Sequence, residues 1–135
     1  MRGETAESRQ RLLKRVRALI AAEYRREVTL GGAARALASS PRQIQRAYEQ
    51  GGETTFREDL HARRLQAGAE LLAGQAALRV EDVARLAGYS HVAYFTRAFR
   101  ERYGTSPGAF RELARGAAAE PVALSASEAW RARPS

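Results

Sequence analysis

Residues 80–104 have the sequence "VEDVARLAGYSHVAYFTRAFRERYG". A short helical pattern of apolar residues ends near Gly88, and a second helical pattern begins three residues later. Two short helices joined by a turn of three or four residues form a helix-turn-helix arrangement. In the second helix Phe95 and Phe99 are spaced i,i+4, so they share one face that is expected to be buried. The opposite face carries Arg97, and the stretch therefore predicts an all-α unit with an exposed basic face.

The same pattern occurs fifty residues earlier, which makes it an internal repeat. Leu30, Ala34 and Ser40 correspond to Val80, Ala84 and Ser90 at an offset of fifty. After one inserted residue, Ile44, Arg46, Ala47 and Tyr48 correspond to Phe95, Arg97, Ala98 and Phe99 at an offset of fifty-one. A duplicated core explains the matching apolar positions, but it does not explain the repeated outward arginine. The repeat therefore favours a duplicated binding unit.

The composition limits the partners and the location of the protein. The 135 residues carry a net charge of +8 at a pI near 10.9, which favours a polyanionic partner. All positive residues but Lys14 are arginine and alanine is abundant, a skew that a GC-rich coding sequence also produces, so charge alone does not identify DNA. The chain has no cysteine, no long apolar run and no secretory signal, so no disulfide, membrane span or export is expected and a cytoplasmic location is predicted.

Seven helices are expected along the chain, in four segments. Residues 1–55 hold a first helix (6–27) and the first helix-turn-helix, 56–73 form a linker helix, 74–115 form the second helix-turn-helix, and 116–135 form a flexible tail. The first helix buries a stripe of Leu13, Val16, Ile20 and Tyr24, and its basic opposite face is either solvated or in contact with phosphates. Ser106 is a predicted N-cap for a final helix beginning at Pro107. For Trp130 in the tail, docking on the domain, partner contact and disorder all stay open.

The exposed faces of the two second helices supply the candidate DNA contacts. Arginine pairs with guanine and glutamine with adenine in the major groove, so Arg42, Gln45 and Arg46 form an informative base-contacting set. In the second unit Ala93 and Thr96 offer apolar contact to thymine methyls, while Arg97 contacts a base or a phosphate. Glu49 is excluded because a carboxylate repels phosphate. Ser40 and Ser90 stand at the starts of the two helices and are predicted N-caps. The predicted phosphate contacts are these two serines together with His91 and Arg100, supported by the backbone donors at the helix N-termini.

The linker helix sets an expected separation of these two faces. About 17 residues at ~1.5 Å per residue give a helix roughly 25 Å long. That length suits two helices placed about one DNA turn, ~34 Å, apart on one side of a duplex. One chain is thus expected to bind as a monomer where dimeric helix-turn-helix proteins use two chains.

The ordered set of motifs resembles the DNA-binding domain of the AraC/XylS family of bacterial transcriptional regulators over about residues 12–111. The second unit follows the family pattern I-x-x-I-A-x-x-x-G-F-x-x-x-x-Y-F-x-R-x-F-K and then G-x-(T/S)-P-x-x-(Y/F)-R, and "RRLQAGAELL" resembles the linker pattern. The resemblance implies seven helices, monomer binding to adjacent major grooves, and base contacts at the six residues above and at Val92. No room for a sensing domain precedes Leu12, so the chain resembles the stand-alone members of the family, with a fragment of a longer protein as the alternative. The expected partners are double-stranded DNA and RNA polymerase, and no cofactor or metal is expected.

The first unit departs from the family pattern. Gly31 and Gly32 stand where helix-forming residues are usual, and each glycine costs about 1 kcal/mol relative to alanine in a helix. Glu53 replaces a glycine, and Gly68 replaces an alanine in the linker helix. We therefore expect the first helix-turn-helix to be locally less stable than the second.

Two other function classes were weighed. An enzyme is not expected, because His61 and His91 lie on different helices without an acidic pair or a nucleophile arranged around either. The alternative is an interaction protein that uses the same fold to bind RNA polymerase or another regulator, with Arg63 and Arg64 or the tail as its docking patch.

Overall fold

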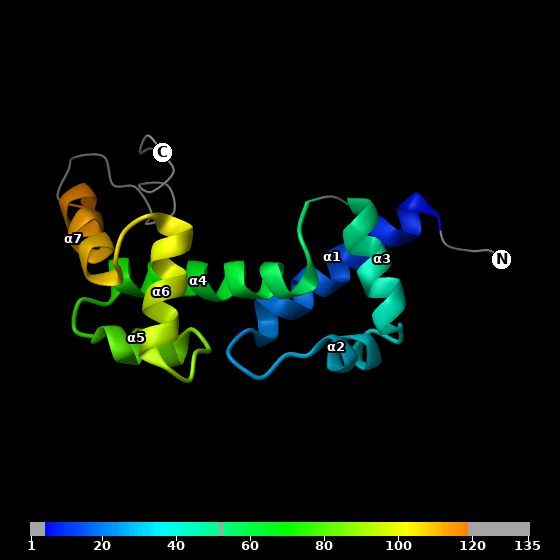
Figure 1. Ribbon diagram of the computed structural model, residues 1–135, viewed down its shortest axis with the longest axis horizontal. Coiled ribbons are helices and arrows are strands. Elements are labelled where there is room, and N and C mark those ends of the chain that lie inside the picture. The colour runs from blue at the N-terminus through cyan, green and yellow to red at the C-terminus, as the bar shows by residue number, and fades with distance from the viewer. Residues whose placement is uncertain (1–4, 52, 119–135) are drawn as a thin grey trace. The chain divides into compact units, whose positions relative to one another are not determined.

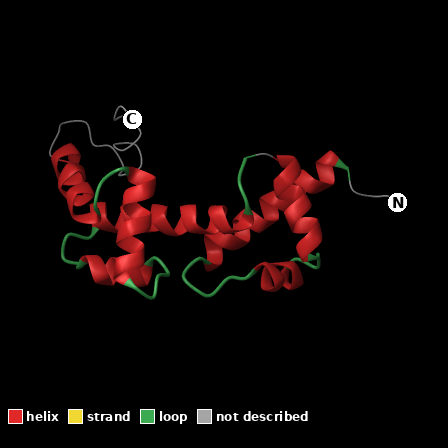
Figure 2. Cartoon of the chain, in the orientation of Figure 1, coloured by secondary structure: helices red, strands yellow, loops and turns green. Residues whose placement is uncertain are grey.

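The computed structural model describes residues 5–51 and 53–118. In this part of the chain all regular secondary structure is α-helix. Figure 2 shows helices and connecting loops in the described part, with no strand. The predicted all-α class with seven helices is confirmed for these residues (Figure 1). The helices are α1 (Ala6–Glu23), α2 (Leu30–Ala36), α3 (Pro41–Gly51), α4 (Phe56–Gly74), α5 (Val80–Leu86), α6 (Val92–Tyr103) and α7 (Pro107–Ala118).

The chain divides into two compact units within α4. Unit 1 is Met1–Arg63 and unit 2 is Arg64–Ser135. The core of unit 1 consists of Leu13, Val16, Ile20, Ala33, Ala34, Ile44, Ala47, Tyr48 and Leu60. The core of unit 2 consists of Leu65, Ala69, Leu72, Val83, Ala84, Ala87, Tyr89, Phe95, Phe99 and Phe110. Ala34 and Ala84, which occupy equivalent positions of the repeat, are both buried.

Two helix ends differ from the sequence-based expectation. α1 ends at Glu23 instead of residue 27, because the Arg26 N–H bonds to the Glu23 carbonyl at 2.9 Å in a closing turn. α7 extends to Ala118, past the residue at which the tail was expected to begin. Trp130 lies outside the described residues. Within those residues, no helix is both long and apolar enough to cross a membrane.

Both helix-turn-helix turns have the same hydrogen-bond pattern. After α2, the Ser39 N–H bonds to the Ala34 carbonyl at 2.8 Å and the Ala38 N–H to the Arg35 carbonyl at 3.3 Å. After α5, the Tyr89 N–H bonds to the Ala84 carbonyl at 2.9 Å and the N–H of residue 88 to the Arg85 carbonyl at 3.0 Å. These paired bonds define the Schellman motif, which ends a helix with one residue in the left-handed conformation.

The residue in the left-handed conformation differs between the two units. Gly88 has φ 102° in unit 2, whereas Ala38 has φ 55° at the equivalent position in unit 1. Glycine adopts a positive φ without steric cost, while a Cβ in that region costs about 1–2 kcal/mol. This strain adds to the helix-weakening effect of Gly31 and Gly32, and it supports the expectation that the first helix-turn-helix is the less stable one.

Ala38→Gly is expected to stabilise unit 1 by up to about 1 kcal/mol, because relief of the strained φ outweighs the greater freedom of glycine in the unfolded chain. The matched change, Gly88→Ala, should destabilise unit 2 by about 1–2 kcal/mol. Amide hydrogen exchange resolves both effects, and in the wild type it should show weaker protection in residues 30–48 than in 80–99. Equal or stronger protection in residues 30–48, or a loss of stability in Ala38→Gly, would contradict the expectation.

Arg111 holds the end of α4 and the loop after it. Its Nε donates to the Leu72 carbonyl at 3.3 Å, and its Nη2 donates to the carbonyls of Gln75 and Leu78 at 3.4 and 2.5 Å. The carbonyls at a helix C-terminus lack intrahelical donors, and a guanidinium can satisfy several of them at once. Arg111 of α7 thereby fixes the connection that leads into the second helix-turn-helix.

Candidate nucleic-acid interface

α3 has one buried face and one exposed face, as the sequence predicts. Ile44 and Tyr48 are buried, at 0% and 3% exposure. Arg42, Gln45 and Arg46 are all exposed on α3. The three candidate base-contacting residues of the first unit thus lie together on the outer surface of one helix, and the aliphatic and aromatic side chains of the same helix fix it to the core.

The N-terminus of α3 is capped as predicted. The Gln43 N–H donates to Ser40 Oγ at 3.1 Å, and Pro41 occupies the first helical position, which needs no amide donor. The Ser39 hydroxyl donates to Gln43 Oε1 at 2.7 Å and orders the turn. A helix N-terminus carries a partial positive charge and unpaired amide donors, so this end of α3 suits a phosphate.

A charged network fixes α3 to its neighbours within unit 1. The Tyr48 hydroxyl donates to Asp59 Oδ2 at 2.8 Å, and Arg17 Nε donates to the same oxygen at 2.8 Å. Hydrogen bonding to Asp59 raises the pKa of Arg17, and burial raises the pKa of Tyr48, so the network favours the protonated form of both groups. The network joins α1, α3 and α4 and fixes the rotation of α3 about its own axis. No local sequence pattern reveals this network, since the three residues lie far apart in the chain.

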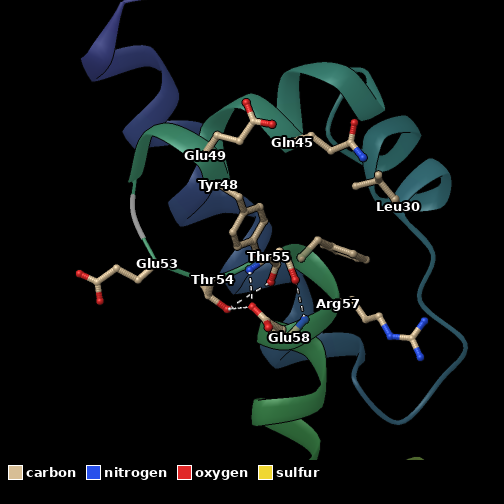
Figure 3. Close-up of a pocket in the computed structure, with 10 residues that line it drawn as sticks. Leu30, Gln45, Tyr48, Glu49, Glu53, Thr54, Thr55, Arg57 and Glu58 are labelled. Carbon is tan, nitrogen blue, oxygen red and sulfur yellow. Dashed lines mark hydrogen bonds between the residues drawn. The ribbon is translucent and has the colours of Figure 1, made fainter.

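An acidic groove lies beside the C-terminal half of α3. Figure 3 shows Gln45 and Glu49 on α3 and Tyr48 pointing from the same helix toward Thr55. The start of α4 forms a capping box, in which the Glu58 N–H donates to Thr55 Oγ1 at 3.1 Å and the Thr55 N–H to Glu58 Oε1 at 3.1 Å. The charged residues that line the groove are three carboxylates and one guanidinium: Glu49, Glu53, Glu58 and Arg57. The excess of carboxylates is unfavourable for a polyanion near Glu49, in agreement with its exclusion from the expected base contacts.

α6 has the same two-faced organisation in unit 2. Phe95 and Phe99 are both 0% exposed, while Ala93, Arg97 and Arg100 are exposed. The other two candidate residues of α6 differ in exposure and polarity. Val92 is 40% exposed and thus a large apolar group at the surface, whereas Thr96 is only partly exposed. The exposed face of α6 therefore offers few hydrogen-bonding groups besides its arginines.

The expected N-cap at Ser90 is wrong. α6 begins at Val92 with His91 in the N-cap position, and the His91 side chain makes no capping hydrogen bond. The turn of the second unit contains one more residue than that of the first, so the residue equivalent to Ser40 is His91 at an offset of fifty-one. Ser90 and His91 are nevertheless both exposed beside the start of α6. The N-terminus of α6 lacks a side-chain cap and leaves its amide donors open to a phosphate.

Several basic residues outside the two exposed faces are engaged within their own units. Arg15 Nη2 donates to the Leu37 carbonyl at 3.3 Å, at the end of α2. The Arg63 guanidinium lies 4.7 Å from the centroid of the Tyr24 ring, and Arg63 is partly buried. Burial lowers the pKa of Arg64, which lies near the rings of two tyrosines of unit 2. Arg63 and Arg64 therefore contribute to packing, which weighs against their use as a free docking patch.

Comparison with known proteins places this geometry in a recognised group. The family model described as "Helix-turn-helix domain" matches residues 33–113. The transcriptional activator NphR of a Rhodococcus species is 36% identical over 86 residues, which cover 64% of this chain and 25% of that protein. The chain spans a quarter of the length of the curated relatives it matches.

Solved structures share the fold. A DNA-binding transcriptional dual regulator from Escherichia coli K-12 superposes with a TM-score of 0.72 at 28% identity, covering 78% of this chain and 93% of that one. A probable AraC family transcriptional regulator from Rhodopseudomonas palustris CGA009 superposes with a TM-score of 0.69 at 24% identity, covering 77% of this chain and 97% of that one. At this level of identity the second match establishes similarity of fold.

Proposed function

The chain belongs to the AraC-type helix-turn-helix family, and from that premise we propose that it regulates transcription by binding a specific sequence of double-stranded DNA. One observation carries the proposal. Each unit has a helix held to its core by two buried side chains spaced i,i+4, and each such helix presents an arginine, Arg46 or Arg97, on its exposed face. A packing requirement accounts for the buried pairs but not for the repeated exposed arginine.

The proposed base contacts come from α3 and α6. Arg42, Gln45 and Arg46 supply donors and an acceptor for major-groove base edges. The proposed contacts from α6 are Val92, Ala93, Thr96 and Arg97, which contribute apolar contact to thymine methyls and one guanidinium. Because hydrogen bonds discriminate between bases more strongly than apolar contacts do, α3 is the main source of sequence specificity in this proposal.

The proposed phosphate contacts lie at the helix starts and beside the base-contacting residues. They are Ser40, Ser90, His91 and Arg100, supported by the amide donors at the N-termini of α3 and α6. One chain carries both helix-turn-helix units, so we propose that a monomer engages two adjacent major grooves. RNA polymerase is the proposed protein partner, as expected for a regulator that acts at a promoter.

The decisive experiment is selection of random duplex DNA by the purified chain, followed by sequencing. We expect two conserved half-sites whose centres lie about one helical turn apart. Selection of a single half-site would contradict simultaneous binding by both units. Recovery of no common sequence would contradict sequence-specific binding and favour the interaction-protein alternative.

Arg46→Ala is expected to weaken binding to the selected duplex by about 1–3 kcal/mol and to relax the preference at one base pair. The reason is that a guanidinium contacting a guanine edge is lost without a substitute donor. Competition binding against duplexes changed at each position of the first half-site measures the effect. Glu49→Gln on the same helix is the control and should leave the selected sequence unchanged. An unaltered preference in Arg46→Ala would show that the exposed face of α3 is wrongly assigned.

A further inference from the structure

A stack of rings connects the core of unit 2 to Arg97. The buried Phe95 ring lies 5.4 Å from the ring of Tyr89, which is 4% exposed. Tyr89 packs edge-to-face against Tyr94, with ring centroids 5.7 Å apart and an interplanar angle of 90°. The Arg97 guanidinium in turn lies 5.8 Å from the centroid of the Tyr94 ring. The exposed arginine thus rests against a ring that is itself supported from the core.

The Tyr94 ring lies at the surface of unit 2, where one edge packs on Tyr89 and part of the ring stays open to solvent. It is 39% exposed, which is unusual for a large aromatic side chain next to a well-packed core. The edge-to-face contact with the buried Tyr89 restrains the Tyr94 ring from the core side, and Arg97 lies over the ring at the surface. Such a ring is suited to serve as a fixed platform.

We propose that Tyr94 is a positioning residue for Arg97, holding its guanidinium in one orientation before DNA arrives. The inference rests on the proposed function and adds to it a determinant of specificity. An unrestrained arginine loses rotamer freedom when it binds a base, and a side chain ordered beforehand loses less. A cation–π contact uses none of the N–H donors of the guanidinium, so Tyr94 orders Arg97 and leaves these donors available for a base.

The first unit has a different arrangement at the equivalent position. At an offset of fifty-one Tyr94 corresponds to Gln43, whose amide oxygen accepts a hydrogen bond from the Ser39 hydroxyl at 2.7 Å. The side chain three positions before Arg46 is therefore an amide tied to the turn and not an aromatic ring. The α6 face has few hydrogen-bonding groups, so the order of its single base-contacting guanidinium matters more there than on α3.

A double-mutant cycle with Tyr94→Leu, Arg97→Ala and their combination tests the proposal. The readout is the discrimination between two duplexes, measured as the ratio of their Kd values. One is the selected duplex, and the other is changed at the single base pair at which Arg97→Ala relaxes the preference. Tyr94→Leu should lower the discrimination by about two- to fivefold, the size expected of an exposed cation–π contact. Tyr94→Phe keeps the ring and should stay within about twofold of the wild type. In the Arg97→Ala background, Tyr94→Leu should have no further effect.

A measurement on the free protein tests the ordering of Arg97 without DNA. The heteronuclear NOE of the Arg97 Nε–H group should fall in Tyr94→Leu and persist in Tyr94→Phe, while the thermal midpoints of both variants stay near that of the wild type. Unchanged order in Tyr94→Leu would overturn the inference, as would an equal loss of discrimination with and without Arg97. Wild-type discrimination in Arg97→Ala would overturn it too. Failure of the proposed function is distinguishable from these outcomes, because the wild-type protein itself would then select no common DNA sequence.

Discussion

Raising the salt concentration from about 50 mM to about 200 mM is expected to weaken binding to the selected duplex by about three orders of magnitude. The estimate takes about six neutralised phosphates, which release counterions and give a slope of log K against log salt near −5. The chain has a net charge of +8, and the proposed phosphate contacts use helix N-termini as well as Arg100. Fluorescence anisotropy over a salt series measures the slope directly.

Two variants of neighbouring residues on α6 make this measurement specific. Arg100→Gln should reduce the slope by about 0.9 and weaken all sequences alike, because it removes one phosphate contact. Glu101→Gln removes a charge of the opposite sign from an exposed position of the same helix and should not reduce the slope. A slope near zero in the wild type would contradict DNA binding through phosphates and would favour an interaction protein.

The helices and both cores could be predicted from the sequence because they depend on local periodicity. The buried pair Phe95 and Phe99 was found from its i,i+4 spacing alone, and it is fully buried. Ser40 and Ser106 are predicted N-caps because each stands at the start of an expected helix, and both accept the expected N–H bond at 3.1 Å. Such features involve residues three or four positions apart, where sequence spacing and structural proximity coincide.

The features that could not be predicted depend on residues far apart or on a turn of altered length. The Arg17–Asp59–Tyr48 network and the carbonyls held by Arg111 join positions separated by more than ten residues, with no local pattern. The N-cap of α6 is misplaced at Ser90 when the offset of fifty, which relates α2 to α5, is carried across the turn that contains the inserted residue. The offset of the second helices, fifty-one, identifies His91 correctly.

Phe95→Ala is expected to destabilise unit 2 by about 3–5 kcal/mol. The side chain is 0% exposed and contacts the rings of Tyr89 and Phe99, so its removal leaves a cavity in the middle of the core. The loss is most of the stability that a small unit has. Amide hydrogen exchange should show protection lost in residues 80–110 and largely kept in residues 12–48. Ile44→Ala, the matched change in unit 1, should give the reverse pattern, and equal loss in both units from either variant would show that they unfold as one.

The close approach of α4 to Phe95 makes the effect of a substitution at Gly68 depend on that ring. A Cβ at Gly68 would lie 2.8 Å from Cε1 and Cζ of Phe95, so Gly68→Ala should destabilise the wild type by about 1–3 kcal/mol. In the Phe95→Ala background the ring is absent, and the same change should stabilise by up to about 1 kcal/mol because alanine favours the helix. Chemical denaturation of the four proteins measures this reversal of sign. Additive effects would show that the ring and the helix backbone are not in contact, and that the glycine in place of the family's alanine has some other cause.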